Sequence, residues 1–217
     1  MKPEQFLETI FRADRELRDA EAHLMETRDQ NTLVDILWKA TEAARKMQDR
    51  REGTVRLERL ADLCAQVSGP RMTDALILIL DDEDPAVRVA AGEALLDVGY
   101  ERYAEVARGI ERVLEKKHKG SSMAELPWVL AEIGEPSALG LIRRFLENED
   151  AEVCASAIEA LATLTDPGAI PALEALVDDE REVSIDDGES ETTTTIGELA
   201  VEAIAELGGE TDKSDQD

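Results

Sequence analysis

The chain has 217 residues and a formal net charge of −26, because 50 Asp and Glu residues stand against 24 Lys and Arg residues. Hydrophobic residues make up 43% of the chain, which excludes a disordered acidic protein poor in apolar residues. Net −26 also excludes a general nucleic-acid binder, since phosphates would be repelled over most of the surface. The charge is uneven: 14 acids and 12 bases lie in residues 1–70, 21 and 10 in residues 71–177, and 15 and 2 in residues 178–217.

The first part of the chain predicts helices that are less regular than those that follow. Residues 2–29 predict one long amphipathic helix, with Phe6, Ile10, Leu17 and Leu24 close to one stripe. We expect this helix to cap the following helices, since a helix stack must cover its terminal apolar face. Two further helices, in 32–47 and 54–67, form a degenerate pair and complete an N-terminal region of residues 1–69. Neither a signal peptide nor a membrane span is expected.

A repeat begins near residue 70. A polar loop followed by an apolar-periodic helix occurs four times, in residues 81–99, 119–134, 147–165 and 194–208. Leu95, Leu130, Leu161 and Ile204 occupy equivalent positions, spaced by 35, 31 and 43 residues. Each of these helices follows another apolar helix, in residues 70–80, 101–117, 136–147 and 167–177. The unit is therefore a helix pair, and the last unit carries a 12-residue insertion within residues 178–195.

Helix-start and helix-stop residues support these boundaries. Asp84 and Asp166 each precede a proline, which is typical of an N-cap before the first helical turn. Gly99 and Gly134 are expected to end helices. Residues 209–217 are polar, and we expect a disordered, frayed acidic tail there.

The repeat resembles the HEAT-repeat family, and specifically the short bilin-lyase-type HEAT-like repeats. The resemblance rests on "DDEDPAVRVAAGEALLDVG" (81–99), "ENEDAEVCASAIEALATLTDPGAIPAL" (147–173) and "AVEAIAELG" (200–208), and it covers residues 70–208. It implies an all-α, right-handed α-solenoid of about five antiparallel helix pairs, here with a small β-hairpin insertion. Family members often tie the two helices of a repeat with an Asp and an Arg. Arg88 keeps that Arg, whereas Cys154 replaces it in a later unit.

In such solenoids the second helix of each pair lines the concave face, which implies a surface for a partner. Aligning these helices gives one column of Glu93, Trp128, Glu159 and Glu202, and a second column of Asp97, Glu132, Thr163 and Glu206 one turn later. One interpretation is an acidic groove that binds a basic partner around Trp128. The other is an ordinary solvated helix face with Trp128 beside Pro127.

The insertion in the last repeat predicts a β-hairpin. Val183 and Ile185 alternate with polar residues, Asp187 and Gly188 form a turn signal, and a run of Thr follows. These residues either form a flap over one end of the groove or belong to a tolerated acidic loop.

Residues 115–122 form a basic loop where the equivalent loops are acidic. Its Lys116, Lys117, His118 and Lys119 either meet an acidic partner or phosphate, or offset the negative end of the preceding helix dipole.

Nothing in the sequence predicts catalysis. The two histidines, His23 and His118, lie far apart, and no nucleophile elbow, zinc motif or Gly-rich phosphate loop is present. We expect no enzyme activity, no cofactor and no metal site, since the acidic runs do not match a calcium loop. Cys64 and Cys154 are interpreted as buried apolar residues of a protein in a reducing cytoplasm.

Two explanations compete for the acidity. It either selects a basic partner or adapts the whole surface to high salt, and the scarcity of Lys, with 7 Lys against 17 Arg, favours a halophilic archaeal source. The preferred function is a non-catalytic scaffold or adaptor that binds another protein on the concave face. The alternatives are an inhibitor or immunity protein for a basic toxin or nuclease, and a lyase or enzyme-accessory protein. No nucleic acid or membrane is expected as a partner, and the sequence is consistent with a monomer.

Overall fold

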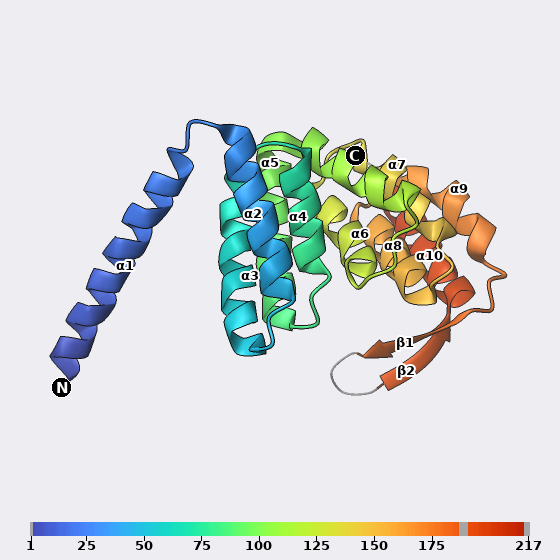
Figure 1. The fold of residues 1–217 in the computed structure, drawn as a ribbon. Coiled ribbons are helices and arrows are strands. Elements are labelled where there is room, and N and C mark those ends of the chain that lie inside the picture. Colours follow the sequence, from blue (N-terminus) through green and yellow to red (C-terminus); the bar gives the residue numbers. More distant parts are fainter. Residues whose placement is uncertain (1, 187–190, 215–217) are drawn as a thin grey trace.

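The computed structural model describes residues 2–186 and 191–214, and these form an all-α solenoid of stacked helix pairs with one small hairpin (Figure 1). This confirms the predicted fold class. The helices are α1 (Pro3–Met25), α2 (Gln30–Arg45), α3 (Arg50–Ala65), α4 (Pro70–Leu80), α5 (Pro85–Glu115), α6 (Ser122–Ile133), α7 (Ala138–Ile142), α8 (Ala151–Thr163), α9 (Ile170–Leu173) and α10 (Ile196–Ser214). Short 3₁₀ segments η1 (Arg143–Glu147), η2 (Pro167–Ala169) and η3 (Glu174–Leu176) extend α7 and flank α9, and the strands are β1 (Glu182–Asp186) and β2 (Glu191–Thr195).

Aspartates begin four of the helices in the stack, α2, α3, α5 and α8. The side chains of Asp29, Asp49, Asp84 and Asp150 each accept a hydrogen bond from a backbone N–H in the first turn of the following helix. Asp166 does the same for Gly168 at the start of η2. Each cap satisfies a donor that the helix itself leaves unpaired. The acidic loops of the repeat are therefore partly structural.

The core is aliphatic and continuous from α2 to α10. Phe145 is the largest fully buried side chain, and leucines and isoleucines supply most of the remainder. Cys64 and Cys154 are free and buried. Burial raises the pKa of the Cys64 thiol to about 12, so this cysteine stays protonated and unreactive.

Two helices join within α5, as the sequence predicts, but the break lies at Arg102 rather than at Gly99. Arg102 has a φ of −141° and a ψ of 49°, which are not helical, and the second helix runs on to Glu115. The Arg102 guanidinium donates to the backbone oxygen of Ala65 at 2.7 Å, which ties the kink to the end of α3. Gly99 packs closely on Ile133: a Cβ there would lie 2.3 Å from Ile133 Cδ1, so the Ile133 side chain would have to move.

The first helix forms as expected but does not cap the stack. α1 projects away from α2 and α3 in Figure 1, and it contains no buried residue. Only its last turn reaches the body of the protein, where Leu24 and Met25 pack against the core and Glu21 pairs with Arg59 at 2.8 Å. The expected cap therefore differs from the observed arrangement, because the short connection after Met25 directs α1 outward.

The last repeat differs from the expectation at its end. α10 continues through Gly208 and Gly209 to Ser214, so residues 209–214 are helical where a frayed tail was expected. β1 and β2 pair antiparallel, with Val183 opposite Thr194 and Ile185 opposite Thr192, which confirms the predicted hairpin. The hairpin returns directly into α10 through backbone bonds from Ile196 N–H to Arg181 O and from Gly197 N–H to Asp179 O.

Arg181 makes the loop contact that Cys154 cannot make. In the earlier repeat, Arg88 Nη1 donates to the loop carbonyls of Asp82 and Glu83 at 3.2 and 3.0 Å. In the later repeat, Arg181 Nη1 donates to the equivalent carbonyls of Asn148 and Glu149 at 2.7 and 3.3 Å. Arg181 comes from the following unit, immediately before β1, and is held by Asp179 at 2.7 Å. The same loop contact is therefore made by a different residue.

Candidate functional site

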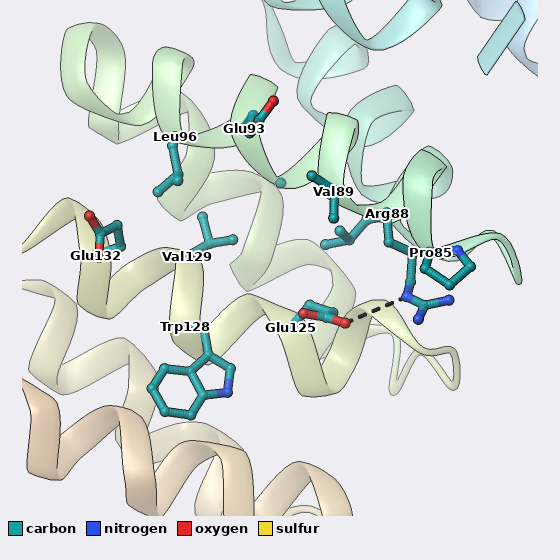
Figure 2. Close-up of a pocket in the computed structure, with 11 residues that line it drawn as sticks. Pro85, Arg88, Val89, Glu93, Leu96, Glu125, Trp128, Val129 and Glu132 are labelled. Atoms are coloured by element: carbon teal, nitrogen blue, oxygen red, sulfur yellow. Dashed lines mark ion pairs between the residues drawn. The ribbon is translucent and has the colours of Figure 1, made fainter. Parts of the chain in front are cut away.

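One hollow on the surface of the repeats lies between the first half of α5 and α6. It has a volume of about 350 Å³, and Figure 2 shows the side chains that line it. We call it the α5–α6 groove. Its apolar lining comes from Leu80, Pro85, Val89, Gly92, Leu96, Trp128 and Val129, and its charged lining from Arg88, Glu93, Glu125 and Glu132.

Trp128 and Val89 are the exposed apolar residues of this groove. Val89 is 60% exposed and Trp128 is 39% exposed, although Pro127 beside Trp128 is buried. A half-exposed indole in the same groove as an exposed aliphatic side chain is the kind of surface on which a partner gains binding free energy.

The acidic residues of the groove differ in how they are neutralised. Glu125 lies 3.6 Å from Arg88, and Glu132 accepts a hydrogen bond from the Tyr100 hydroxyl at 3.4 Å. Burial, together with the charges of Glu132 and Asp97, raises the pKa of Tyr100, so its hydroxyl stays protonated and can donate. Within residues 2–186 and 191–214, Glu93 and Glu132 form no salt bridge. The groove therefore presents negative charge beside an apolar floor.

A second hollow of about 350 Å³ lies at the start of α10. Val177, Thr195, Gly197, Glu198, Val201, Glu202 and Ala205 line it. Val201 and Val177 are 54% and 39% exposed, so this hollow also has an apolar floor and an acidic rim. We call it the α10 hollow.

Glu159 of α8 belongs to the same acidic region. Burial and the nearby charge of Glu202 both raise the pKa of Glu159, so the two predicted column residues are electrostatically coupled. A positively charged group between them would relieve this repulsion.

The structure brings together part of the predicted set. Glu93, Trp128 and Glu132 line the α5–α6 groove, and Glu202 lines the α10 hollow. Asp97 and Glu206 are exposed but line neither hollow. Thr163 donates its hydroxyl to the backbone oxygen of Glu159 at 3.0 Å and is used locally.

The residues assigned to a flap have different environments. Val183 is 7% exposed and packs in the core, so it anchors the hairpin and cannot serve as a flap contact. Ile185 pairs through its backbone with Thr192. The predicted turn at Asp187 and Gly188 lies outside the described residues.

Sequence reasoning missed Val89, Leu96 and Tyr100. The predicted columns contained residues 93 and 97 of α5. The side chains that face α6 instead come from residues 85, 89, 92 and 96, and from Tyr100, whose hydroxyl lies 3.4 Å from Glu132. The spacing of four and three residues along α5 was the available signal.

The basic loop is partly structural. His118 Nε2 lies 2.5 Å from Asp81 Oδ2, and the other oxygen of Asp81 accepts the Ser122 N–H at 2.9 Å. Asp81 thereby links the end of α5 to the start of α6. This favours the local interpretation of His118 over an exposed anion site.

Among the described residues, no group of three or more His, Cys, Asp or Glu side chains is arranged to hold a metal ion. Over the same residues, no helix is both long enough and apolar enough to cross a bilayer.

Comparison with known proteins identifies a repeat type. A family model described as HEAT repeats matches residues 124–185, from α6 into β1. No curated protein matches the chain. The matched segment contains α7 and α8 with the 3₁₀ segments that lengthen their repeats, which agrees with the stacked helix pairs of the fold.

Several solved structures of engineered or designed proteins are similar at low identity. An engineered protein is 16% identical, with a TM-score of 0.37, over 88% of this chain and 96% of that one. A computationally designed armadillo repeat protein for modular peptide recognition is 14% identical, with a TM-score of 0.35, over 86% and 98%. A designed armadillo repeat protein in complex with the peptide (KR)4 is 18% identical, with a TM-score of 0.36, over 85% and 98%. Residues 124–185 are therefore similar to HEAT repeats, and the stacked helix pairs of the fold agree with this match.

Proposed function

We propose that this protein is a non-catalytic scaffold that binds a segment of another protein along the α5–α6 groove and toward the α10 hollow. Stacked helix-pair repeats typically act as interaction scaffolds, because stacking creates a long surface lined by equivalent helices. The observation that carries the proposal is the exposed pair of Val89 and Trp128 in a groove rimmed by acidic side chains.

The charge of the surface supports a basic partner segment. Glu93 and Glu132 at one end, and Glu159 and Glu202 further along, form no salt bridge within the part of the chain that the structure describes. The repulsion that raises the pKa of Glu159 would be offset by a cationic side chain. An extended segment with an apolar residue for the groove and Arg side chains beyond it fits this surface.

A peptide-binding assay tests the proposal. Short synthetic peptides that alternate Arg with an apolar residue are titrated against the full chain, with matched peptides that carry Glu in place of Arg. We expect the Arg peptides to bind, and Trp128→Ala to weaken them by at least about tenfold, the scale of an interface hot spot. Glu93→Gln should weaken binding less, mainly at low salt.

The control is Glu111→Gln, which removes the same charge from an exposed position on the second half of α5. Equal affinity for Arg and Glu peptides, or an unchanged affinity in Trp128→Ala, would contradict a binding site in the α5–α6 groove.

A further inference from the structure

α1 carries an uncovered apolar stripe that the proposed function does not use. Five of its large apolar side chains are exposed: Phe6 at 53%, Leu7 at 50%, Ile10 at 61%, Phe11 at 47% and Leu17 at 41%. The helix has no buried residue over its 23-residue length. So many large apolar side chains on one helix mark a surface that another element covers.

The stripe has the spacing of a helix that packs lengthwise on another helical surface. Phe6, Ile10, Ala13, Leu17, Ala20 and Leu24 follow one another at intervals of four and three residues in strict alternation. This is a 3.5-residue period, the period of helices that remain in contact over several turns. The stripe therefore calls for a helical surface rather than a small ligand.

The end of the solenoid offers such a surface, which is also uncovered. Ile36, Ala40 and Ala43 share one face of α2 at helical spacing. Ile36 is 46% exposed and Ala43 is exposed, whereas Ala40 is half-buried against the core. The other side of α2 faces the stack, because Trp38 lies 5.2 Å below the guanidinium of Arg71 from α4. On α3, Val55 is 57% exposed, near Arg56 and Arg59. We call these α2 and α3 residues the end face.

The two surfaces are complementary in charge. Asp14, Glu16 and Glu21 adjoin the α1 stripe, and Arg56 and Arg59 follow Val55 on α3. Some of these charges already form exposed pairs within their own helix: Asp14 with Arg18, Glu16 with Arg12, Arg56 with Glu52 and Arg59 with Asp62. Exposed pairs of this kind are weak and can be exchanged for pairs with a partner. The ion pair of Glu21 and Arg59 at 2.8 Å shows this chemistry at the one point where α1 reaches its own stack. Acidic α1 flanks therefore suit the basic α3 edge.

The connection between α1 and α2 keeps the two surfaces of one chain apart. Glu26 N–H donates to the Ala22 oxygen and Thr27 N–H to the Leu24 oxygen, which closes the end of α1. Asp29 caps α2 through the Asn31 N–H and the Thr32 hydroxyl. With cap bonds on both sides of Arg28, the connection holds α1 at the outward angle seen in Figure 1.

Two other occupants fit less well. Pairing of α1 with a second α1 would bring Asp14, Glu16 and Glu21 of both helices together, which is repulsive. An anionic bilayer is disfavoured because α1 has six acidic residues against three arginines. The basic, partly apolar end face has neither problem.

We propose that the protein forms a reciprocal dimer in which α1 of each copy packs on the end face of the other. Because the two contacts are identical and related by a two-fold axis, both stripes and both end faces are covered at once. The dimer leaves the α5–α6 groove and the α10 hollow free.

Charge reversal in the full-length protein tests whether α1 of each copy packs on the end face of the other. The first variant is Asp14→Arg/Glu21→Arg on α1, and the second is Arg56→Glu/Arg59→Glu on the end face. In sedimentation at about 0.2 M KCl, where exposed charges still interact, we expect the wild type to be a dimer and each variant alone to dissociate at least tenfold more readily. Mixing the two variants should restore a heterodimer of near wild-type affinity, because both contacts then join opposite charges.

The control is Arg108→Glu, an exposed charge reversal elsewhere on α5, which should remain dimeric. A monomeric wild type would overturn the proposal, and so would a mixture that stays monomeric, since docking on the same chain cannot be restored by mixing. An end-face variant that dimerises as the wild type does would indicate α1–α1 pairing instead and would equally overturn it. Loss of peptide binding in Trp128→Ala with an intact dimer would separate this inference from the proposed function.

Discussion

The repeat that contains Arg88 and the repeat that contains Cys154 make the same contact in two ways. In the first, an arginine inside the second helix binds the carbonyls of its own loop. In the second, Arg181 reaches back from the start of the insertion to the equivalent carbonyls. The loop carbonyls need a donor wherever the unit repeats, but the donor can come from either neighbour. In the second case the hairpin is fixed to the stack as a consequence.

Replacing Arg88 and Arg181 with alanine, one at a time, compares the stability contributed by the two loop contacts. We expect Arg181→Ala to lower the free energy of unfolding by about 2–3 kcal/mol, because it leaves two loop carbonyls and Asp179 without their charged donor. Arg88→Ala should cost less, about 1–2 kcal/mol, since its hydrogen bonds stay within one loop and its ion pair with Glu125 is longer, at 3.6 Å, and partly exposed. Urea unfolding measures both. A larger loss in Arg88→Ala would reverse the ranking.

Moving the arginine from position 181 to position 154 tests whether the two positions can make the same loop contact. In Arg181→Ala/Cys154→Arg, the arginine returns to the position that Arg88 occupies in the earlier repeat. We expect recovery of about 1 kcal/mol relative to Arg181→Ala, because the new guanidinium can enter the space vacated beside Asn148 and Glu149. The same unfolding assay applies. A double variant that is less stable than Arg181→Ala alone would mean that the two positions are not interchangeable.

Salt should affect the two ends of the chain differently. Residues 1–70 carry a net −2 and residues 178–217 carry a net −13, so repulsion concentrates around the hairpin and α10. If the acidity is an adaptation to high salt, about 2 M KCl should raise the melting temperature and slow amide exchange in α10 more than in α2 and α3. Full stability and uniform protection at low salt would contradict the adaptation.

Replacement of Glu159 should have the smallest effect on stability of these variants, and its direction follows from the pKa shift. Its folded pKa is raised, so the folded state binds the proton more tightly than the unfolded state does, and stability falls as the pH rises from the unfolded pKa to the folded pKa. Glu159→Gln removes that cost and should stabilise the protein by about 0.5 kcal/mol at pH 7 while weakening a basic peptide. Thermal melts at pH 4 and pH 7 measure the difference, with Glu152→Gln as the exposed control on α8. A destabilised Glu159→Gln at pH 7 would contradict the electrostatic origin.

The repeat architecture could be predicted because it is encoded locally. Asp-Pro starts, apolar periodicity and the equivalent Leu95, Leu130 and Leu161 fix where helices begin and which sides are buried. The break expected at Gly99 lies instead at Arg102, three residues further on, where the Arg102 guanidinium donates to the backbone oxygen of Ala65. This contact joins α5 to the end of α3, and the sequence pattern does not show it.

Part of the candidate site could also be predicted, because it follows from the alignment of equivalent repeat positions. Trp128 stood out because its equivalents are all Glu, and it does line the α5–α6 groove. Arg181 and Tyr100 could not be found this way. Each acts across units, on Asn148 in one case and on Glu132 in the other, so their roles depend on how neighbouring repeats are placed. The outward direction of α1 likewise depends on a short connection and not on its apolar stripe.

The most direct test of the scaffold is the fluorescence of Trp128 during binding. A Trp38→Phe background removes the other tryptophan, which lies away from the groove against Arg71. Titration with an Arg-containing synthetic peptide should shift the Trp128 emission as the half-exposed indole is covered, with a saturation curve that matches the affinity measured by calorimetry. Binding that saturates with no change in Trp128 emission would contradict a partner site in the α5–α6 groove.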